Sequence, residues 1–203
     1  QKTAYEIYQC DWSSDVCSSD LAVHTHHGLI VLFNPETGEP LCVMDGRLIT
    51  EMRTAAVSAA ATQALAREDS HMLAILGSGV QARSHLESMR LIRNFTEVRV
   101  WSPRNAQRFA DEHRVTAAAT AEECVRGADV ICVVTGSETP VLNGEWLEPG
   151  VHINAVGANR PTWRELDDEC LHRSKIYVEY REAAFKESGD VIAEGRSSPS
   201  SER

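Results

Sequence analysis

The sequence lacks several signals that would place the chain in a particular class of protein. It has no apolar run long enough to span a membrane and no N-terminal stretch with the basic start and apolar middle of a secretory signal. Its six cysteines include no Cys-x-x-Cys pair, so neither a zinc site nor a disulfide framework is indicated. The net charge of −10 disfavours nucleic acids and anionic membranes as partners. We therefore expect a cytoplasmic protein with reduced thiols and no membrane or nucleic-acid partner.

What remains is the composition of a globular chain, with 203 residues of which 42% are hydrophobic. This length suffices for one sizeable domain, or for one domain and part of another. Four residues, His24-Thr25-His26-His27, form a histidine cluster that could invite a metal. Their spacing fits no structural zinc pattern and no cysteine or carboxylate lies nearby in sequence, so we expect no metal site.

Both ends of the sequence differ from the stretch between them. Residues 11–20 match, codon by codon, one reading frame of a common sequencing-library adapter, so we set aside residues 1–21 as an artefact. A genuine Ser/Asp-rich loop is the alternative. Residues 196–203 are polar and patternless, and a one-base frameshift would explain them, with a natural flexible tail as the alternative. We expect the chain to be a fragment of a longer protein.

The central feature is an apolar run, 71–76, that ends in a Gly-x-Gly-x-x-Ala turn and opens into a helical pattern. In such a turn Gly77 allows a sharp bend, Gly79 lets a pyrophosphate approach the backbone, and Ala82 keeps the helix close to the sheet. The N–H groups at the start of the helix suit an anion. Alone the motif is weak, because similar turns occur in sheets that bind nothing. A strand before it and a helix and second strand after it favour a dinucleotide site.

The end of the second strand bears on the choice of dinucleotide. An acidic residue there would bind the ribose hydroxyls of NAD, whereas a small hydroxyl residue beside an arginine accommodates the 2′-phosphate of NADP. Ser102 and Arg104 occupy this position, which favours NADP(H) over NAD(H). The competing interpretation is that residues 102–105 are a helix start, with Ser102 as N-cap and Pro103 in the first turn.

The alternation of patterns predicts an α/β fold with a Rossmann doubly wound parallel sheet, preceded by part of a second, sheet-containing domain. We expect residues 22–66 to form part of a dimerisation or substrate domain with a connecting helix, and residues 67–195 to form the nucleotide domain. Strand-end loops border the ligand crevice of such a sheet, which places Thr135 and Val156 near the cofactor. The predicted strands are 28–33, 41–44, 71–76, 97–101, 129–135, 150–156 and 175–180. The predicted helices are 50–66, 80–94, one from 102, a short one capped by Thr120 with Glu123, 164–173 and 181–188.

Arg53 falls in the first turns of the helix that we expect Thr50 to cap. A cation at a helix N-terminus opposes the helix dipole, so an anionic partner would explain this arginine better than helix stability does. A solvated surface arginine is the alternative.

Several long motifs in natural order resemble the ornithine cyclodeaminase and mu-crystallin family, most closely its mu-crystallin branch. The resemblance covers residues 22–195, and two shorter stretches, 163–169 and 187–190, strengthen it. The motifs that carry it are 43–46 (Val-Met-Asp-Gly), 53–59 (Arg-Thr-Ala-Ala-Val-Ser-Ala), 77–82 (Gly-Ser-Gly-Val-Gln-Ala) and 153–161 (Ile-Asn-Ala-Val-Gly-Ala-Asn-Arg-Pro).

The resemblance implies a homodimer that reduces cyclic ketimines or imino acids, or deaminates amino acids, with a nicotinamide cofactor. It implies that Arg53 binds the substrate carboxylate, that Thr54 lies near the cofactor phosphates, and that the family's active-site lysine lies upstream of this chain. We therefore expect Arg53 and Asn159 to bind substrate. The residues expected to bind the cofactor are Thr54, Gly77, Gly79, Val80, Gln81, Ala82, Ser102, Arg104, Thr135 and Val156.

Asn159 separates the possible activities. Ornithine cyclodeaminases carry an aspartate at this position, where it handles protons, and an amide cannot act as a general base. This difference favours reduction of a preformed imine over cyclodeamination or amino-acid dehydrogenation. A non-catalytic protein that binds a hydrophobic, hormone-like carboxylate in the same cleft is the alternative that the mu-crystallin branch adds.

Overall fold

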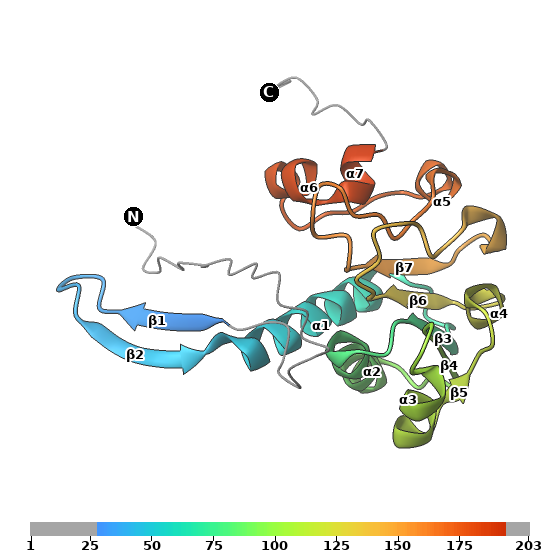
Figure 1. The fold of residues 1–203 in the computed structure, drawn as a ribbon, viewed down its shortest axis with the longest axis horizontal. Coiled ribbons are helices and arrows are strands. Elements are labelled where there is room, and N and C mark those ends of the chain that lie inside the picture. The colour runs from blue at the N-terminus through green and yellow to red at the C-terminus, as the bar shows by residue number, and fades with distance from the viewer. Residues whose placement is uncertain (1–27, 194–203) are drawn as a thin grey trace. The chain divides into compact units, whose positions relative to one another are not determined.

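The structure is a computed structural model that describes residues 28–193 (Figure 1). The chain divides into two compact units, Gln1–Arg53 and Thr54–Arg203. The histidine cluster at 24–27 and the two terminal stretches set aside above lie outside the described residues.

The described part of the first unit contains the predicted hairpin. Strand β1 (Leu29–Phe33) pairs antiparallel with β2 (Pro40–Asp45). The turn is stabilised by the side chain of Asn34, whose Oδ1 accepts a hydrogen bond from the backbone N of Glu36 at 2.9 Å. The hairpin leaves four large apolar side chains exposed: Leu29, Phe33, Leu41 and Val43.

Helix α1 (Gly46–Leu65) begins four residues before the position predicted for its cap, so the assignment of Thr50 as N-cap is wrong. Asp45 caps the helix instead, because its Oδ1 accepts a hydrogen bond from the backbone N of Arg47 at 2.8 Å. Arg53 consequently lies about two turns into the helix. The dipole acts within the first turn, so it no longer argues for an anionic partner of Arg53.

The second unit contains the predicted Rossmann sheet, with all five strands parallel in the order β5-β4-β3-β6-β7. Counted along this unit the order is 3-2-1-4-5, and it reverses direction between β3 and β6. Ligands of such sheets bind outside the carboxyl ends of the strands at this reversal. The strands are β3 (Met72–Leu76), β4 (Glu97–Trp101), β5 (Thr116–Ala117), β6 (Val130–Val133) and β7 (His152–Ala155).

Helices cover both faces of the sheet, which explains why β3 is buried along its whole length (Figure 1). Alternate side chains point to opposite faces. Leu73 and Ile75 pack with α2 (Val80–Ile92) and α3 (Ala106–His113), whereas Ala74 and Leu76 pack with α4 (Ala121–Val125) and α5 (Asp168–Arg173). The nearly continuous apolar strands of the sequence are thus satisfied by two cores.

The C-terminal half of α1 is fixed to this unit by buried polar contacts. Ser58 Oγ lies 2.9 Å from His85 Nε2 of α2, and Asn154 Nδ2 of β7 donates to Thr62 Oγ1 at 2.9 Å. Burial lowers the pKa of His85, so this imidazole is neutral at ordinary pH. These hydrogen bonds satisfy polar groups that would otherwise be costly to bury.

Three predicted helix starts agree with the structure, at Val80, after Thr120 and at Arg181, and four further predictions need correction. Thr120 caps α4 as predicted, accepting from the backbone N of Glu123. Helix α3 begins at Ala106, because residues 103–105 form a turn, so Ser102 and Pro103 are not its cap and first residue. The other corrections concern the C-terminal region. Residues 164–167 precede helix α5 and are not helical, residues 175–180 form no strand, and Gly189 opens α7 (Gly189–Ala193) after α6 (Arg181–Glu187) has ended.

Within residues 28–193, no helix combines the length and the apolar character needed to cross a membrane. The same residues contain no group of three or more His, Cys, Asp or Glu side chains arranged to hold a metal ion. The described cysteines are free thiols: Cys42, Cys124, Cys132 and Cys170.

Candidate functional site

The glycine turn lies at the point where the strand order reverses, between the ends of β3 and β6. Gly77 has a φ of 122°, and a Cβ built on it would lie 2.7 Å from the carbonyl oxygen of Val134, just beyond β6. Its backbone N donates to the carbonyl oxygen of Trp101 at the end of β4, at 2.8 Å. Only glycine fits this position, because both the backbone angle and the neighbouring strand exclude a side chain.

Gly79 differs from Gly77, because a Cβ at this position would meet no atom within 4 Å. Gly79 is the N-cap of α2 and has no side chain, so the first N–H groups of this 13-residue helix receive no hydrogen bond from their capping residue. Such a helix start, free of side chains, fits the pyrophosphate of a dinucleotide. The fold therefore requires glycine at 77, whereas it leaves room for a side chain at 79.

The three residues after Gly79 have different environments. Val80 is exposed, and Ala82 is fully buried against the sheet, where it allows the close approach of α2. Gln81 has a buried Oε1 with no hydrogen-bond partner among the described residues. An unpaired buried acceptor costs about 1–3 kcal/mol, so a donor from outside these residues, such as a hydroxyl group, would complete the site.

The loop after β4 is joined to the glycine turn through two hydroxyl groups. Ser78 Oγ and Ser102 Oγ lie 2.8 Å apart, and Ser102 Oγ also accepts from the backbone N of Asn105 at 3.2 Å. Arg104 lies in the same turn and is exposed. The structure thus brings Ser102 next to the glycine turn, with Arg104 two residues away on the surface.

The loops after β6 and β7 are joined by a carboxylate that sequence reasoning missed. Glu165 is fully buried. Its Oε1 accepts from the backbone N and from the Oγ1 of Thr135, both at 2.6 Å, and its Oε2 accepts from the backbone N of Gly157, also at 2.6 Å. Val156, the residue before Gly157, donates from its backbone N to Val133 at 3.0 Å. The predicted residues Thr135 and Val156 therefore lie at neighbouring strand ends.

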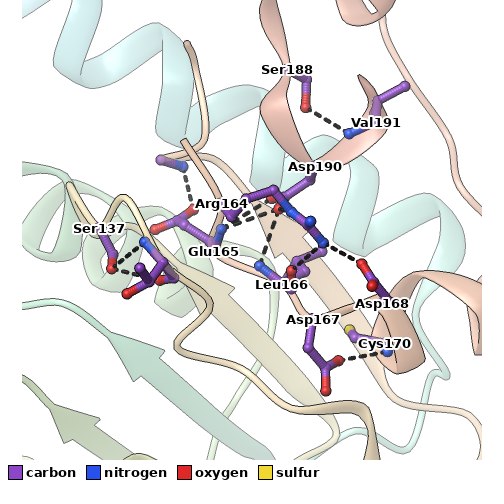
Figure 2. A network of polar contacts seen from close by, with 12 residues as sticks. Ser137, Arg164, Glu165, Leu166, Asp167, Asp168, Cys170, Ser188, Asp190 and Val191 are labelled. Carbon is purple, nitrogen blue, oxygen red and sulfur yellow. Dashed lines mark hydrogen bonds and ion pairs between the residues drawn. The ribbon is translucent and has the colours of Figure 1, made fainter. Parts of the chain in front are cut away.

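A second carboxylate supports the first (Figure 2). Asp190 Oδ1, from α7, accepts from the backbone N of Glu165 at 3.1 Å and from that of Leu166 at 3.2 Å. The guanidinium of Arg164 donates to Asp190 at 3.2 Å and to the exposed Asp168 at 2.8 Å. The sequence contains these residues in two motifs, but a pairing over 25 residues leaves no periodic signal.

Burial governs the protonation of these carboxyl groups. Desolvation raises the pKa of Glu165 to about 7, although the hydrogen bonds from Thr135 and Gly157 act to lower it. Burial likewise raises the pKa of Asp190, against the hydrogen bonds from Leu166, Glu165 and Arg164. Glu165 therefore changes charge near neutral pH, while its three donors favour the ionised form.

The remaining predicted residues lie in α1 and after β7. Arg53 is exposed and is the last residue of the first unit, whereas Thr54 is the first of the second unit and is half-buried. Asn159 is exposed in the turn after β7, where its backbone N donates to Gly157 at 2.8 Å. Asn159 thus lies two residues after Gly157, whose backbone N donates to Glu165.

Known proteins are similar to this chain in sequence. The model of the ornithine cyclodeaminase/mu-crystallin family matches residues 14–202, a range that includes parts of both terminal stretches. Ketimine reductase mu-crystallin of the mouse is 51% identical over 181 residues, which is 87% of this chain and 58% of the mouse protein.

Two solved structures give the same result at the level of the fold. Δ1-pyrroline-2-carboxylate reductase of Thermococcus litoralis, in complex with NADH and L-proline, has a TM-score of 0.83 and 37% identity, covering 87% of this chain and 57% of its own. An archaeal alanine dehydrogenase dimer with bound NAD has a TM-score of 0.81 and 36% identity, covering 88% and 57%. The chain spans less than two thirds of the length of each of these relatives. By this family match and these identities, the chain belongs to the ornithine cyclodeaminase/mu-crystallin family.

Proposed function

We propose that the full-length protein containing this chain reduces cyclic ketimines or imino acids with a nicotinamide dinucleotide. The observation that carries the proposal is the glycine turn at the reversal of the strand order, with Gly79 and the start of α2 open to an anion. The mouse relative is named a ketimine reductase, and the Thermococcus relative a Δ1-pyrroline-2-carboxylate reductase bound to NADH. These names support a reductase that acts on C=N bonds.

The residues of this chain divide the task between them. Gly77, Gly79 and the first N–H groups of α2 would hold the pyrophosphate. Arg53 would bind the substrate carboxylate through its planar guanidinium and so orient the C=N carbon. The nicotinamide, when bound, supplies the hydride. Asn159 supports reduction over cyclodeamination, because its amide cannot remove a proton.

We further propose that the protein acts as a homodimer in the cytoplasm. The exposed apolar side chains of the hairpin formed by β1 and β2 support assignment of residues 22–66 to a dimerisation or substrate domain, followed by a nucleotide domain at 67–195. The archaeal relative is described as a dimer. The free thiols of the described residues fit a reducing compartment.

The proposal is tested by oxidation of NADPH and NADH by the full-length protein in the presence of cyclic ketimines such as Δ1-pyrroline-2-carboxylate. We expect turnover, followed as loss of the absorbance of the reduced nicotinamide. Tight binding of a hydrophobic carboxylate measured by calorimetry, with no turnover across a broad panel of imines, would instead favour the non-catalytic binding protein.

A second prediction concerns cofactor choice, since the solved relatives hold NAD(H) and the preference for NADP(H) rests on Ser102 and Arg104 of this chain. Arg104→Ala should weaken NADPH binding about 10- to 150-fold, because a charged hydrogen bond contributes about 1.5–3 kcal/mol, and leave NADH binding unchanged. The matched control is Arg108→Ala, which removes an exposed arginine from the neighbouring helix α3. Equal affinities of the Arg104 variant and the control for NADPH would assign Arg104 to the solvated surface.

A further inference from the structure

The three hydrogen bonds that Glu165 accepts join two loops that neighbouring strands carry to the same edge of the sheet. Thr135 follows β6 and Gly157 follows β7, and these strands run parallel and are directly paired. In a doubly wound sheet the first half, here β3 to β5, and the second half, here β6 and β7, each bind one nucleotide of the dinucleotide. The glycine turn belongs to the first half, whereas Glu165 supports the loops of the second half, which follow β6 and β7.

The contacts leave little freedom in these loops. The hydroxyl of Thr135 donates to Glu165 and accepts from the backbone N of Ser137 at 3.1 Å, so both of its roles are used within the protein. A Cβ on Gly157 would lie 2.0 Å from the carbonyl oxygen of Thr135 and 2.4 Å from Glu165 Oε1. The two loops are therefore in direct contact through their backbones, with the buried carboxylate beneath them.

The carboxylate is itself held from a third direction. Its own backbone N donates to Asp190 of α7, and Arg164 links Asp190 to Asp168 of α5 (Figure 2). The charged groups around Glu165 are thus Asp190 on α7, Asp168 on α5 through Arg164, and Arg164 beside it in the chain. Because Glu165 is fully buried and accepts three hydrogen bonds, it acts as a structural support for these loops, and its contacts are not incidental.

We propose that Glu165 is a positioning residue of the reductase, which fixes the backbones of Thr135 and Gly157 so that the nicotinamide half of the site keeps the geometry needed for hydride transfer. The proposal rests on the proposed function and adds a residue to it. It also changes the role of Thr135: its hydroxyl binds Glu165, and the loop backbone that it fixes faces the cofactor.

The substitution Glu165→Gln tests whether this carboxylate holds the two loops together. The amide oxygen can still accept from Thr135, but the amide nitrogen would face the N–H of Gly157, where two donors meet. We expect kcat for the imine to fall about 10- to 100-fold, since a displacement of about 1 Å at a reacting centre costs on this order. Binding of adenosine 2′,5′-bisphosphate, which probes the other half of the site, should be unchanged.

Matched variants exclude a general loss of structure. Thr135→Val removes one hydrogen bond to Glu165 and should lower kcat less than Glu165→Gln does, and Thr135→Ser should recover most of that loss. Asp168→Asn breaks the exposed ion pair with Arg164 without touching Glu165 and should leave kcat unchanged. An unchanged kcat in a folded Glu165→Gln variant, or an equal loss of bisphosphate binding and kcat, would overturn the proposal.

The pH dependence gives an independent readout. Ionised Glu165 accepts all three hydrogen bonds, so wild-type kcat should decline as the pH falls below about 7, and this limb should disappear in Glu165→Gln. Stability should change in the opposite direction. The pKa of Glu165 is raised in the folded state from 4.5 to about 7, so its contribution to stability is lost as pH rises through about 7, and the variant should lack this loss.

A final measurement distinguishes failure of this inference from failure of the proposed function. Amide hydrogen exchange needs no substrate, and in Glu165→Gln it should accelerate at residues 134–139 and 156–160 but not at 77–82. If wild-type protein reduces no imine, the proposed reaction is wrong while the exchange result still tests the support that Glu165 gives to the loops. Unchanged exchange at both loops in Glu165→Gln would refute this support even in an active reductase.

Discussion

Gly77→Ala is expected to destabilise the nucleotide domain by about 2–6 kcal/mol and thereby to abolish dinucleotide binding. The methyl group would lie 2.7 Å from the carbonyl oxygen of Val134, and the φ of 122° is one that residues with a side chain rarely adopt. Such a backbone conformation costs about 1–3 kcal/mol, and overpacking a well-packed region costs about 1–3 kcal/mol more. Denaturant unfolding followed by tryptophan fluorescence measures the loss.

The control is the other glycine of the same turn. A Cβ at Gly79 would meet no atom within 4 Å, and its φ of −87° is ordinary, so Gly79→Ala should change the free energy of unfolding by no more than about 1 kcal/mol. It should nevertheless weaken NADPH binding severely, because its methyl group occupies the approach to the first N–H groups of α2. A stable Gly79→Ala variant with wild-type affinity for NADPH would place the pyrophosphate elsewhere.

The glycine turn shows which parts of the site could be predicted from the sequence. The turn is a contiguous motif that follows the continuous apolar run of β3 and precedes the helical pattern of α2, and the structure has both elements at the predicted places. The strand 97–101 is found with the predicted bounds. Thr120 was correctly assigned as a cap because Glu123 follows it at the spacing of a capping box.

The predictions fail where two local signals compete, or where the partner of a residue or strand is distant in sequence. Asp45 and Thr50 are both good caps, and the hydrogen bond to Arg47 decides for Asp45. Residues 175–180 alternate like a strand, yet strand formation needs a neighbour to pair with, which the sequence pattern cannot specify.

Glu165 shows the second kind of failure at the site itself. Charged residues are normally exposed, so a glutamate between Arg164 and Leu166 indicates a polar helix face unless its partners are known. Two of its three hydrogen bonds come from the backbone N–H groups of Thr135 and Gly157, which have no sequence signature, and the third comes from the distant hydroxyl of Thr135. The family resemblance marked the segment, but only the folded structure connects it to the strand ends.

The other large effect is expected at the substrate. Arg53→Met should raise KM for carboxylated imines about 100-fold, because a charged, bidentate hydrogen bond to a carboxylate contributes roughly 2–4 kcal/mol. Binding of NADPH should be unchanged, since the elements of the candidate dinucleotide site all lie within Thr54–Arg203, whereas Arg53 belongs to the first unit. Steady-state kinetics and calorimetry measure the two constants separately.

Three comparisons make this prediction specific to the carboxylate. Arg47→Met removes another arginine of α1, one that pairs with Asp45 on the surface, and should leave KM unchanged. Arg53→Lys keeps the charge but loses the planar fork, so its KM should lie between those of the wild type and the methionine variant. A cyclic imine without a carboxylate should react equally well with wild type and Arg53→Met. If the methionine variant loses that substrate too, or loses NADPH in proportion, Arg53 supports the structure of the site and does not bind the carboxylate.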